Sequence, residues 1–488
     1  MRVCHGFTAV FDDPNLVSCA GLAPVLLLAE RAGLQELVAR HVSIGKPGGG
    51  NASLKVPALV AGMVAGADSI DDMGLLRHGG MDRLFAGVRA PSTLGTFLRA
   101  FTFGHVRQLD AVAARVLVNL AGQAPLLTAA AELVYVDVDD TVRQTYGHAK
   151  QGAGHGYTGV KGLNALIATV STAASAPVIV GTRLRKGATN SAKGAARLVA
   201  DALITAKAAG ASGLRVLRAD SAFYNHDVIA AASRQKAWFS ITARQDSAVR
   251  KAIATIDAGA WTTIKYPNAI FDEEQQRWIS DAEVAEIPYT AFTSRRRDQH
   301  VAGRLIVRRV RDLNPANQSE LFTVYRYHAV FTNTPLPMLD AEAAHRAHAI
   351  IEQVIADLKN GPLAHLPSGS FAANSAWLVC AAIAFNLTRA AGALASAVHA
   401  RARTATIRTQ LIGVPARLAR SARRVVPAPT PRLALAACLA GATRGSSPTT
   451  RHRVLTTSPT GPDRNRPWKS RTDRQHEHGH QPEQDHKP

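Results

Sequence analysis

Three carboxylates crowd the end of one apolar stretch, residues 133–142. Asp137, Asp139 and Asp140 stand in or directly after a run rich in β-branched residues, which predicts a buried strand. Side chains alternate along a strand, so Asp137 and Asp139 share one face and Asp140 takes the other. Neighbouring acids repel, so the stretch predicts a divalent cation or a basic side chain beside them. The plain alternative is a strand that runs out into a solvated acidic turn.

Two later stretches place further chemical groups in comparable positions. A second mostly apolar strand, Leu214–Ala219, ends on Asp220. A helical segment then carries polar side chains one or two turns apart, which therefore share a face: His345, His348, Glu352 and Lys359. Two strand-end aspartates and one helix-borne glutamate form the oxygen-ligand set that hard cations such as Mg²⁺ use in phosphate chemistry.

Five motifs in order carry a resemblance that spans about residues 10 to 425. They are Asp-Val-Asp-Asp-Thr-Val (137–142), Tyr-Gly-His-Ala-Lys-Gln-Gly-Ala (146–153), Gly-Tyr-Thr-Gly-Val-Lys-Gly-Leu (156–163), Leu-Arg-Ala-Asp-Ser-Ala-Phe-Tyr (217–224) and Ile-Glu-Gln-Val-Ile-Ala-Asp-Leu-Lys-Asn (351–360). With these motifs the chain resembles the DDE transposases of bacterial insertion sequences, and the thirteen-eighty group in particular.

The resemblance implies a catalytic triad of Asp139, Asp220 and Glu352 that holds two Mg²⁺ (or Mn²⁺) ions. The implied activity is cutting and rejoining of double-stranded DNA, at the inverted-repeat ends of the element and at its target, by a homodimer in the DNA complex. The wider supergroup has the pattern Y-x2-R-x3-E-x6-K around its glutamate. Glu352 and Lys359 match it, whereas His345 stands for the tyrosine and His348 for the arginine.

Candidate DNA contacts come from the helix and from the glycine-rich loop that leaves the acidic strand. Glycines let backbone amides approach phosphates, while lysines and tyrosines supply charge and stacking surface. The expected contacts are Lys359, His348, His345, Lys150, Lys161, Tyr157 and Arg244. A plain glycine-rich hairpin is the alternative for the loop, and a structural counter-ion to the carboxylates is the alternative for Lys359.

The elements that must position these groups alternate as in a ribonuclease-H-like core. Expected strands and one helix are Val134–Asp139, Ala165–Ser171, Val178–Leu184, the helix Ala192–Ala209, Leu214–Ala219 and Trp238–Thr242. The fold class is therefore α/β, a ribonuclease-H-like mixed sheet flanked by helices. A β-rich insertion with strands near Trp261–Tyr266, Arg304–Val310 and Leu321–Phe331 interrupts the core.

Five regions follow from these patterns together with the resemblance, which implies the DNA-binding role of the first region. Residues 1–125 are expected to form a helical DNA-binding domain, 126–249 the first part of the catalytic core, 250–335 the insertion, 336–425 the second part of the core with the glutamate helix, and 426–488 a basic, disordered tail. Within the first region, apolar spacing favours a helix over Val25–Val42, and Pro91 marks a helix start.

Composition agrees with a nucleic-acid partner. The chain has 57 Lys and Arg against 36 Asp and Glu, a net charge of +21, which suggests a polyanion and nucleic acid before membrane. The longest apolar run, Ala372–Leu387, contains Asn374 and Asn386 and reads as a buried helix. Four widely spaced cysteines fit a reducing compartment, and we expect a bacterial, cytoplasmic, nucleoid-associated protein.

Two rival functions remain open at this point. One is a catalytically decayed protein that binds DNA ends without cutting them and so inhibits transposition. The two histidine replacements are consistent with this alternative. The other is a nuclease on the same core that cuts without joining. Cleavage activity separates the first rival from a transposase, and strand transfer separates the second.

Overall fold

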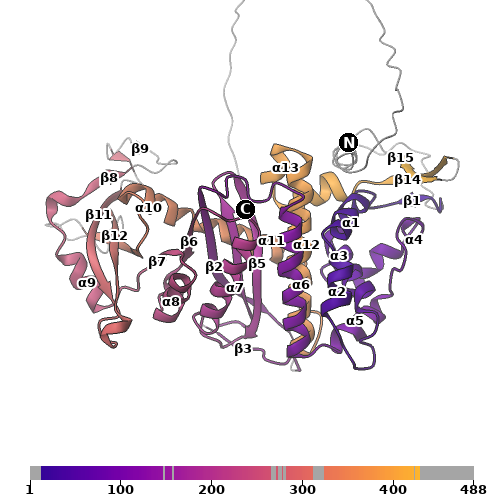
Figure 1. The fold of residues 1–488 in the computed structure, drawn as a ribbon, viewed down its shortest axis with the longest axis horizontal. Helices are drawn as coiled ribbons and strands as arrows, with labels where there is room; N and C mark the ends of the chain where they lie inside the picture. Colours follow the sequence, from indigo (N-terminus) through magenta and orange to yellow (C-terminus); the bar gives the residue numbers. More distant parts are fainter. Residues whose placement is uncertain are drawn as a thin grey trace, which may run out of the picture. The chain divides into compact units, whose positions relative to one another are not determined.

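The computed structural model describes residues 13–146, 149–156, 159–264, 271–272, 277–278, 282–311, 324–421 and 424–428. A ten-stranded mixed sheet runs through it, with helices packed against the sheet and beside it (Figure 1). The strand order is β3-β4-β2-β6-β7-β13-β12-β11-β8, and β5 pairs with β4 outside this path. A continuous hydrophobic core extends from the N-terminal helices into the sheet.

Five strands reproduce the arrangement expected of a ribonuclease-H-like core. They are β2 (Leu133–Gln144), β4 (Lys161–Thr172), β5 (Ser175–Lys186), β6 (Leu214–Ala219) and β7 (Trp238–Thr242). Their spatial order is β5-β4-β2-β6-β7: the first three are antiparallel, and β6 and β7 run parallel to β2. Parallel pairs need crossover helices, here α7 (Ala195–Ala208) and α8 (His226–Arg234).

All five expected core strands are present, and the first three are longer than predicted. The β2–β4 ladder continues past the acids to the pair Gln144↔Gly162, beyond the apolar run that predicted it. Antiparallel pairing supplies hydrogen-bond partners to the backbone groups of these polar ends, so the strands extend beyond the apolar residues that predicted them.

The insertion extends the same sheet. Helix α9 (Ser247–Ala254) precedes four strands, β8 (Thr262–Ile264), β11 (Ala282–Ala291), β12 (Val301–Arg311) and β13 (Tyr325–Thr332), and β13 pairs with β7. A separate pair is formed by β9 (Phe271–Asp272) and β10 (Arg277–Trp278). Strand β11 was not predicted, because its acids and proline break the apolar pattern. Parts of the predicted insertion strands, including Tyr266 and residues 321–323, lie outside the described residues.

The described N-terminal region is mostly helical. Its helices are α1 (Leu22–Arg31), α2 (Leu34–His41), α3 (Ala52–Ala65), the 3₁₀ helix η1 (Asp71–Arg77), α4 (Met81–Leu84), α5 (Pro91–Arg99) and α6 (Phe103–Ala121). The single helix predicted over Val25–Val42 is broken at Gly33, whose φ of 76° is left-handed. Pro91 is the first residue of its helix, as predicted.

The C-terminal part carries the glutamate helix and a long buried helix. Helix α10 (Met338–Arg346) leads through a short 3₁₀ turn (Ala347–Ala349) to α11 (Ile350–Lys359). Helix α12 (Phe371–Ala395) packs against α6, α3 and β5 (Figure 1). Of the described helices it alone is long and apolar enough to cross a membrane, yet 83% of its most apolar window is buried inside the protein, which confirms the expected buried helix.

The described chain ends in short helices and a small sheet. Helices α13 (Ala397–Arg401) and α14 (Thr404–Ile407) precede β14 (Ala416–Ser421), which pairs with β1 (Leu16–Val17) and with β15 (Arg424–Ala428). Apart from β15, the tail expected to be disordered lies outside the described residues.

Candidate active site

The three acids of β2 have three different environments, and Asp137 is the most enclosed. Its side chain is 0% exposed and receives two hydrogen bonds from Arg218, at 2.6 and 2.8 Å. Arg218 is its cross-strand partner on β6. Burial alone would raise the pKa of Asp137, but the guanidinium and a hydrogen bond from His348 hold that pKa below its ordinary value. Asp137 is therefore a buried carboxylate whose charge the protein already balances.

Asp140 points to the opposite face and is also balanced. It forms a buried ion pair with Arg185 of β5 and accepts a 3.0 Å hydrogen bond from Asn164 of β4. Arg185 in turn donates to the Asn164 amide oxygen and to backbone carbonyls that precede α7. These partners come from β4 and β5, whereas those of Asp137 are Arg218 on β6 and His348 between α10 and α11.

Asp139 differs from both neighbours, because the charged group with the largest effect on its pKa is another acid, Asp220. The strand pair ends at Val138↔Ala219, so Asp139 and Asp220 are the next residues on adjacent parallel strands. Burial raises the pKa of Asp139 to about 6, and the charge of Asp220 adds to this rise, while the backbone N–H of Asp140 lowers it. Asp220 is exposed at the surface, yet the protein atoms around its carboxylate partly desolvate it and raise its pKa too. Two strand-end carboxylates thus meet at one sheet edge.

Helix α11 packs against β2 and carries the other candidate groups. Glu352 lies in its first turn with an exposed side chain, and Lys359 is its last residue. Burial lowers the pKa of the half-buried Lys359 and Arg143 lowers it further, while the nearby Asp139 acts in the opposite direction. Within the described residues, no three His, Cys, Asp or Glu side chains converge closely enough to hold a metal ion. The structure therefore places Asp139 and Asp220 at adjacent strand ends and Lys359 near Asp139, without closing Glu352 onto the pair.

The two histidines fasten this region to the sheet. The Nδ1 atom of His348 lies 3.0 Å from Asp137 Oδ1, and its charge lowers the pKa of both Asp139 and Asp220. The ring of His345 contacts the Ser240 and Thr242 hydroxyls of β7 through its two nitrogens, each at 2.9 Å.

Burial lowers the pKa of His345 to about 3, so its ring is neutral. With both ring nitrogens engaged by the protein, His345 positions α10 and α11. Its contact with DNA stays a prediction.

The other predicted DNA contacts are spread around the site. Lys150 donates to the carbonyl of Leu366, and burial lowers its pKa. Together with the hydrogen bond from Gln151 N to the carbonyl of Gly369 (2.9 Å), this bond holds the glycine-rich loop on the segment after α11. Lys161 is partly exposed at the start of β4, and Arg244 is exposed after β7. Tyr157 lies outside the described residues.

Several residues of the site were missed from the sequence. Arg218 lies two residues before Asp220, inside a motif that was read only for its acid, and its guanidinium also donates to the carbonyl of Ala344 and stacks 3.8 Å from the Tyr135 ring centre. Arg143 lies on β2, four residues after Asp139, and donates to the carbonyl of Ala364. A divalent cation or a basic side chain was expected beside the acids, and Arg218 and Arg185 are the basic side chains beside Asp137 and Asp140.

Comparison with protein families gives an independent result. The family model described as transposase DDE domain, group 1, matches residues 6–438. No curated protein matches the chain. The family match covers nearly all of the sequence, including both strands that bear the paired aspartates and the helix that bears Glu352. The chain belongs to the DDE transposases.

Proposed function

We propose that this transposase binds the ends of its element and catalyses metal-dependent DNA cleavage and strand transfer at the edge formed by Asp139 and Asp220. The observation that carries the proposal is the pairing of these two carboxylates. Asp137 and Asp140 are balanced by arginines, whereas Asp139 and Asp220 are the next residues on adjacent parallel strands and burial raises the pKa of both. A divalent cation would relieve this repulsion, so the donor set fits Mg²⁺ or Mn²⁺.

Asp139 and Asp220 would hold the metal ions, and Glu352 would complete the ligand set from α11. Bound metal supplies Lewis-acid stabilisation of the phosphate and a more acidic nucleophile. Because Glu352 does not close onto the aspartates in this structure, we propose that α11 approaches them when DNA and metal bind.

The residues around the pair suit in-line phosphoryl transfer. A water oxygen attacks phosphorus and the P–O3′ bond breaks, leaving a 3′-hydroxyl end. That hydroxyl then attacks a target phosphodiester and displaces its 3′ oxygen. Lys359 would neutralise negative charge on the pentacoordinate phosphorus of the transition state. His348, fixed by Asp137, would support the same phosphate.

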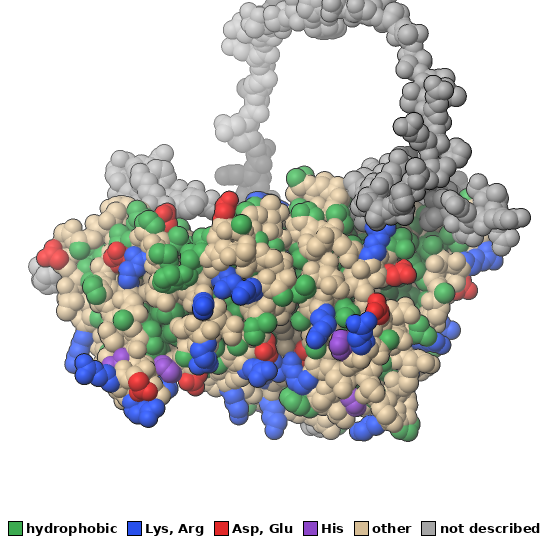
Figure 2. Space-filling view, in the orientation of Figure 1, with side chains coloured by type: hydrophobic (Ala, Val, Ile, Leu, Met, Phe, Trp, Pro, Cys, Tyr) green, Lys and Arg blue, Asp and Glu red, His purple; other side chains and the backbone are tan. Residues whose placement is uncertain are grey.

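The surface charge supports DNA as the partner, and we propose that a homodimer holds the two ends of the element. Figure 2 shows Lys and Arg side chains scattered over the middle and lower parts of the visible face, with fewer Asp and Glu among them. Phosphate contacts of this distributed kind position a duplex without reading its sequence.

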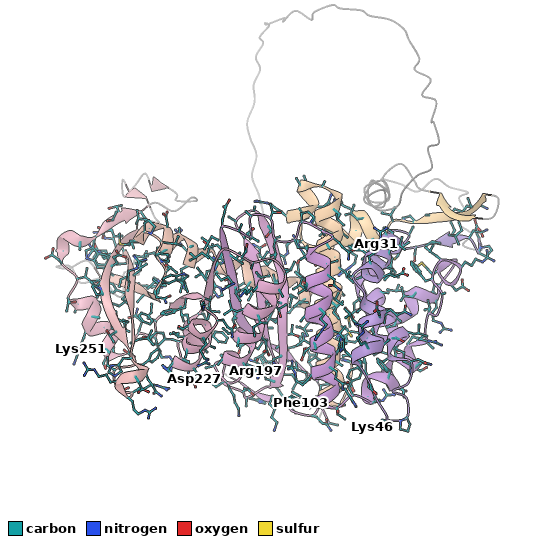
Figure 3. All side chains as sticks on the ribbon, in the orientation of Figure 1. Arg31, Lys46, Phe103, Arg197, Asp227 and Lys251 are labelled. Atoms are coloured by element: carbon teal, nitrogen blue, oxygen red, sulfur yellow. The ribbon has the colours of Figure 1, made fainter. Side chains whose placement is uncertain are left out.

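The test is cleavage and joining of DNA that carries the element's own ends, with Mg²⁺ or with a chelator. Asp139→Asn, Asp220→Asn and Glu352→Gln should each reduce both steps to background while end binding persists. Asp227→Asn is the matched control, because this acid lies on α8 with a 70% exposed side chain (Figure 3). End binding without any cleavage by the wild-type chain would favour the binding-only rival, and cleavage without joining would favour the nuclease.

A further inference from the structure

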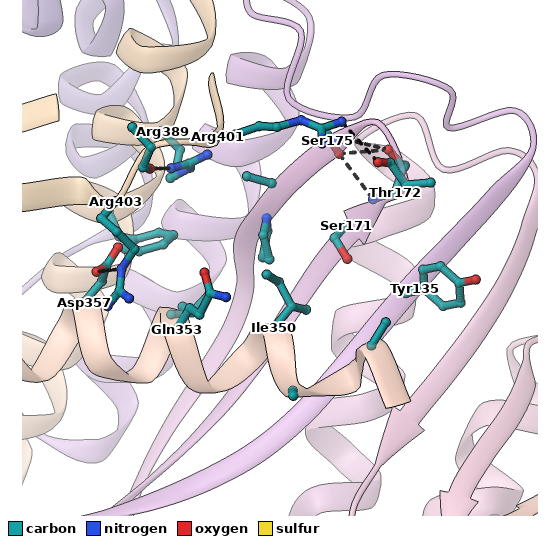
Figure 4. Close-up of a pocket in the computed structure, with 18 of the residues that line it drawn as sticks. Tyr135, Ser171, Thr172, Ser175, Ile350, Gln353, Asp357, Arg389, Arg401 and Arg403 are labelled. Carbon is teal, nitrogen blue, oxygen red and sulfur yellow. Dashed lines mark hydrogen bonds and ion pairs between the residues drawn. The ribbon is translucent and has the colours of Figure 1, made fainter. Parts of the chain in front are cut away.

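A cavity of about 590 Å³ lies beside the glutamate helix (Figure 4), and its lining does not include Glu352 or Lys359. Its α11 face is formed by Ile350, Gln353, Val354 and Asp357. The β4–β5 hairpin forms a second wall, and α12 with the segment 401–403 forms the third. The volume falls within the range of about 300–1,000 Å³ that is typical of small-molecule sites.

The walls of this cavity are mostly apolar, with charge at one end. Alanines, Pro177, Ile350, Val354 and Phe385 line it, and Tyr135 closes the far side beneath Arg218. Arg389 and Arg403 lie close to Asp357 on the left side of Figure 4, while Arg401 extends away from this carboxylate toward Ser175 and the β4–β5 hairpin. The lining therefore carries more positive than negative side chains.

The protein neutralises only part of this charge. Arg403 Nε donates to Asp357, whose second oxygen accepts the Thr404 backbone N–H. Arg389 donates to the carbonyls of Ala400 and Ala402, which supply dipoles but no formal charge. Arg401 is exposed and makes a long hydrogen bond, 3.4 Å, to the carbonyl of Ala173. Arg401, exposed on the cavity and held by this one long hydrogen bond, can therefore bind an anion.

We propose that this cavity binds a small organic anion of about mononucleotide size, with its apolar or planar body against Ile350, Val354 and Phe385 and its phosphate or carboxylate on Arg401. Duplex DNA fits the cavity less well, because its backbone would leave the apolar walls without a partner. The inference does not depend on the proposed chemistry, since no lining residue belongs to the acid pair.

Adenosine monophosphate is the probe that tests the cavity, using the full chain without DNA and isothermal titration calorimetry. It should bind in one site, whereas adenosine and inorganic phosphate alone should bind much more weakly. Arg401→Gln should weaken binding by about tenfold or more, the loss expected of one charge-assisted hydrogen bond. Gln353→Trp should block binding, because the exposed Gln353 tolerates a large side chain that fills the cavity. Arg234→Gln, at an exposed position on α8, should bind like wild type.

Thermal melting without ligand checks that each variant is folded. Equal affinity for the probe in wild type, Arg401→Gln and Gln353→Trp would overturn the proposal. So would equal binding of inorganic phosphate and the nucleotide, because the apolar walls would then contribute nothing. Displacement of the nucleotide by duplex DNA that lacks terminal phosphates would assign this surface to DNA, and it would also overturn the proposal.

Discussion

The buried Asp137–Arg218 pair makes a quantitative prediction about stability. The two side chains are 0% and 2% exposed and are joined by two hydrogen bonds of 2.6 and 2.8 Å. Removing one partner of such a pair leaves an uncompensated buried charge, which costs about 3–5 kcal/mol. Arg218→Met should therefore lower the free energy of unfolding by that amount, measured by urea denaturation of the purified variants.

A double variant tests whether the loss comes from the stranded charge. In Asp137→Leu with Arg218→Met both charges are gone, and only His348 Nδ1 and the Ala344 carbonyl lose partners. Unpaired polar groups of this kind cost about 1–3 kcal/mol each. Each single variant already leaves one of these two groups unpaired, so the double variant exchanges an uncompensated buried charge for one further unpaired polar group. It should thus be at least as stable as either single variant. Additive losses, or an Arg218→Met protein as stable as wild type, would refute the reasoning.

The pH dependence of the same variant has a definite sign. In wild type the pKa of Asp137 is held low, so its contribution is complete above about pH 4 and is lost only as pH falls further. Without Arg218 the pKa of the buried carboxyl rises, and protonation relieves the stranded charge. The deficit of Arg218→Met relative to wild type should therefore shrink as the pH is lowered from 8 to 5. A deficit that is constant over this range would contradict the assignment of the loss to Asp137.

Three further predictions concern the candidate site. Because the pKa of Asp139 is raised to about 6, its charge destabilises the metal-free protein progressively as pH rises from about 4 to above 6. At pH 8 in chelator, Asp139→Asn should therefore be more stable than wild type by roughly 2 kcal/mol. Calorimetry that shows equal or lower stability of the variant would contradict this. Lys359→Ala should keep its melting temperature and lose cleavage and end binding, with a shallower salt dependence by about one phosphate contact; early unfolding with normal cleavage by the folded fraction would make the lysine structural. The pKa of His345 is lowered to about 3 against an ordinary value near 6.5, so the protein should lose stability as pH falls between these values, and His345→Gln should flatten that loss in acid denaturation curves.

The core of the fold was predictable because its signals are local. Apolar runs bounded by turns located β2, β4, β5, β6 and β7, and the placement of Asp139 beside Asp220 follows from two parallel strands that end on acids. Strand β11 and the break at Gly33 were missed, because an edge-like strand rich in polar residues and a single left-handed glycine leave weak patterns.

Partners that come from distant elements could not be predicted. Nothing local joins Asp140 to Arg185, or His345 to the hydroxyls of β7, because these contacts depend on how strands and helices meet in three dimensions. The position of the helix that bears Glu352 has the same origin. It depends on contacts between residues far apart in the sequence, such as that of His348 with Asp137 and that of Arg218 with the carbonyl of Ala344.

Those contacts bear on the two histidines that depart from the supergroup pattern. A replacement that merely damaged this helix would leave buried polar groups without partners, at a cost in stability. Instead, His348 contacts the carboxylate of Asp137 and His345 contacts the hydroxyls of Ser240 and Thr242. Both histidines are thus integrated into the docking of α10 and α11 on the sheet. Fold stability at this point is therefore expected in an active transposase and in a binding-only protein alike, so DNA cleavage, and not thermal stability, is the measurement that separates them.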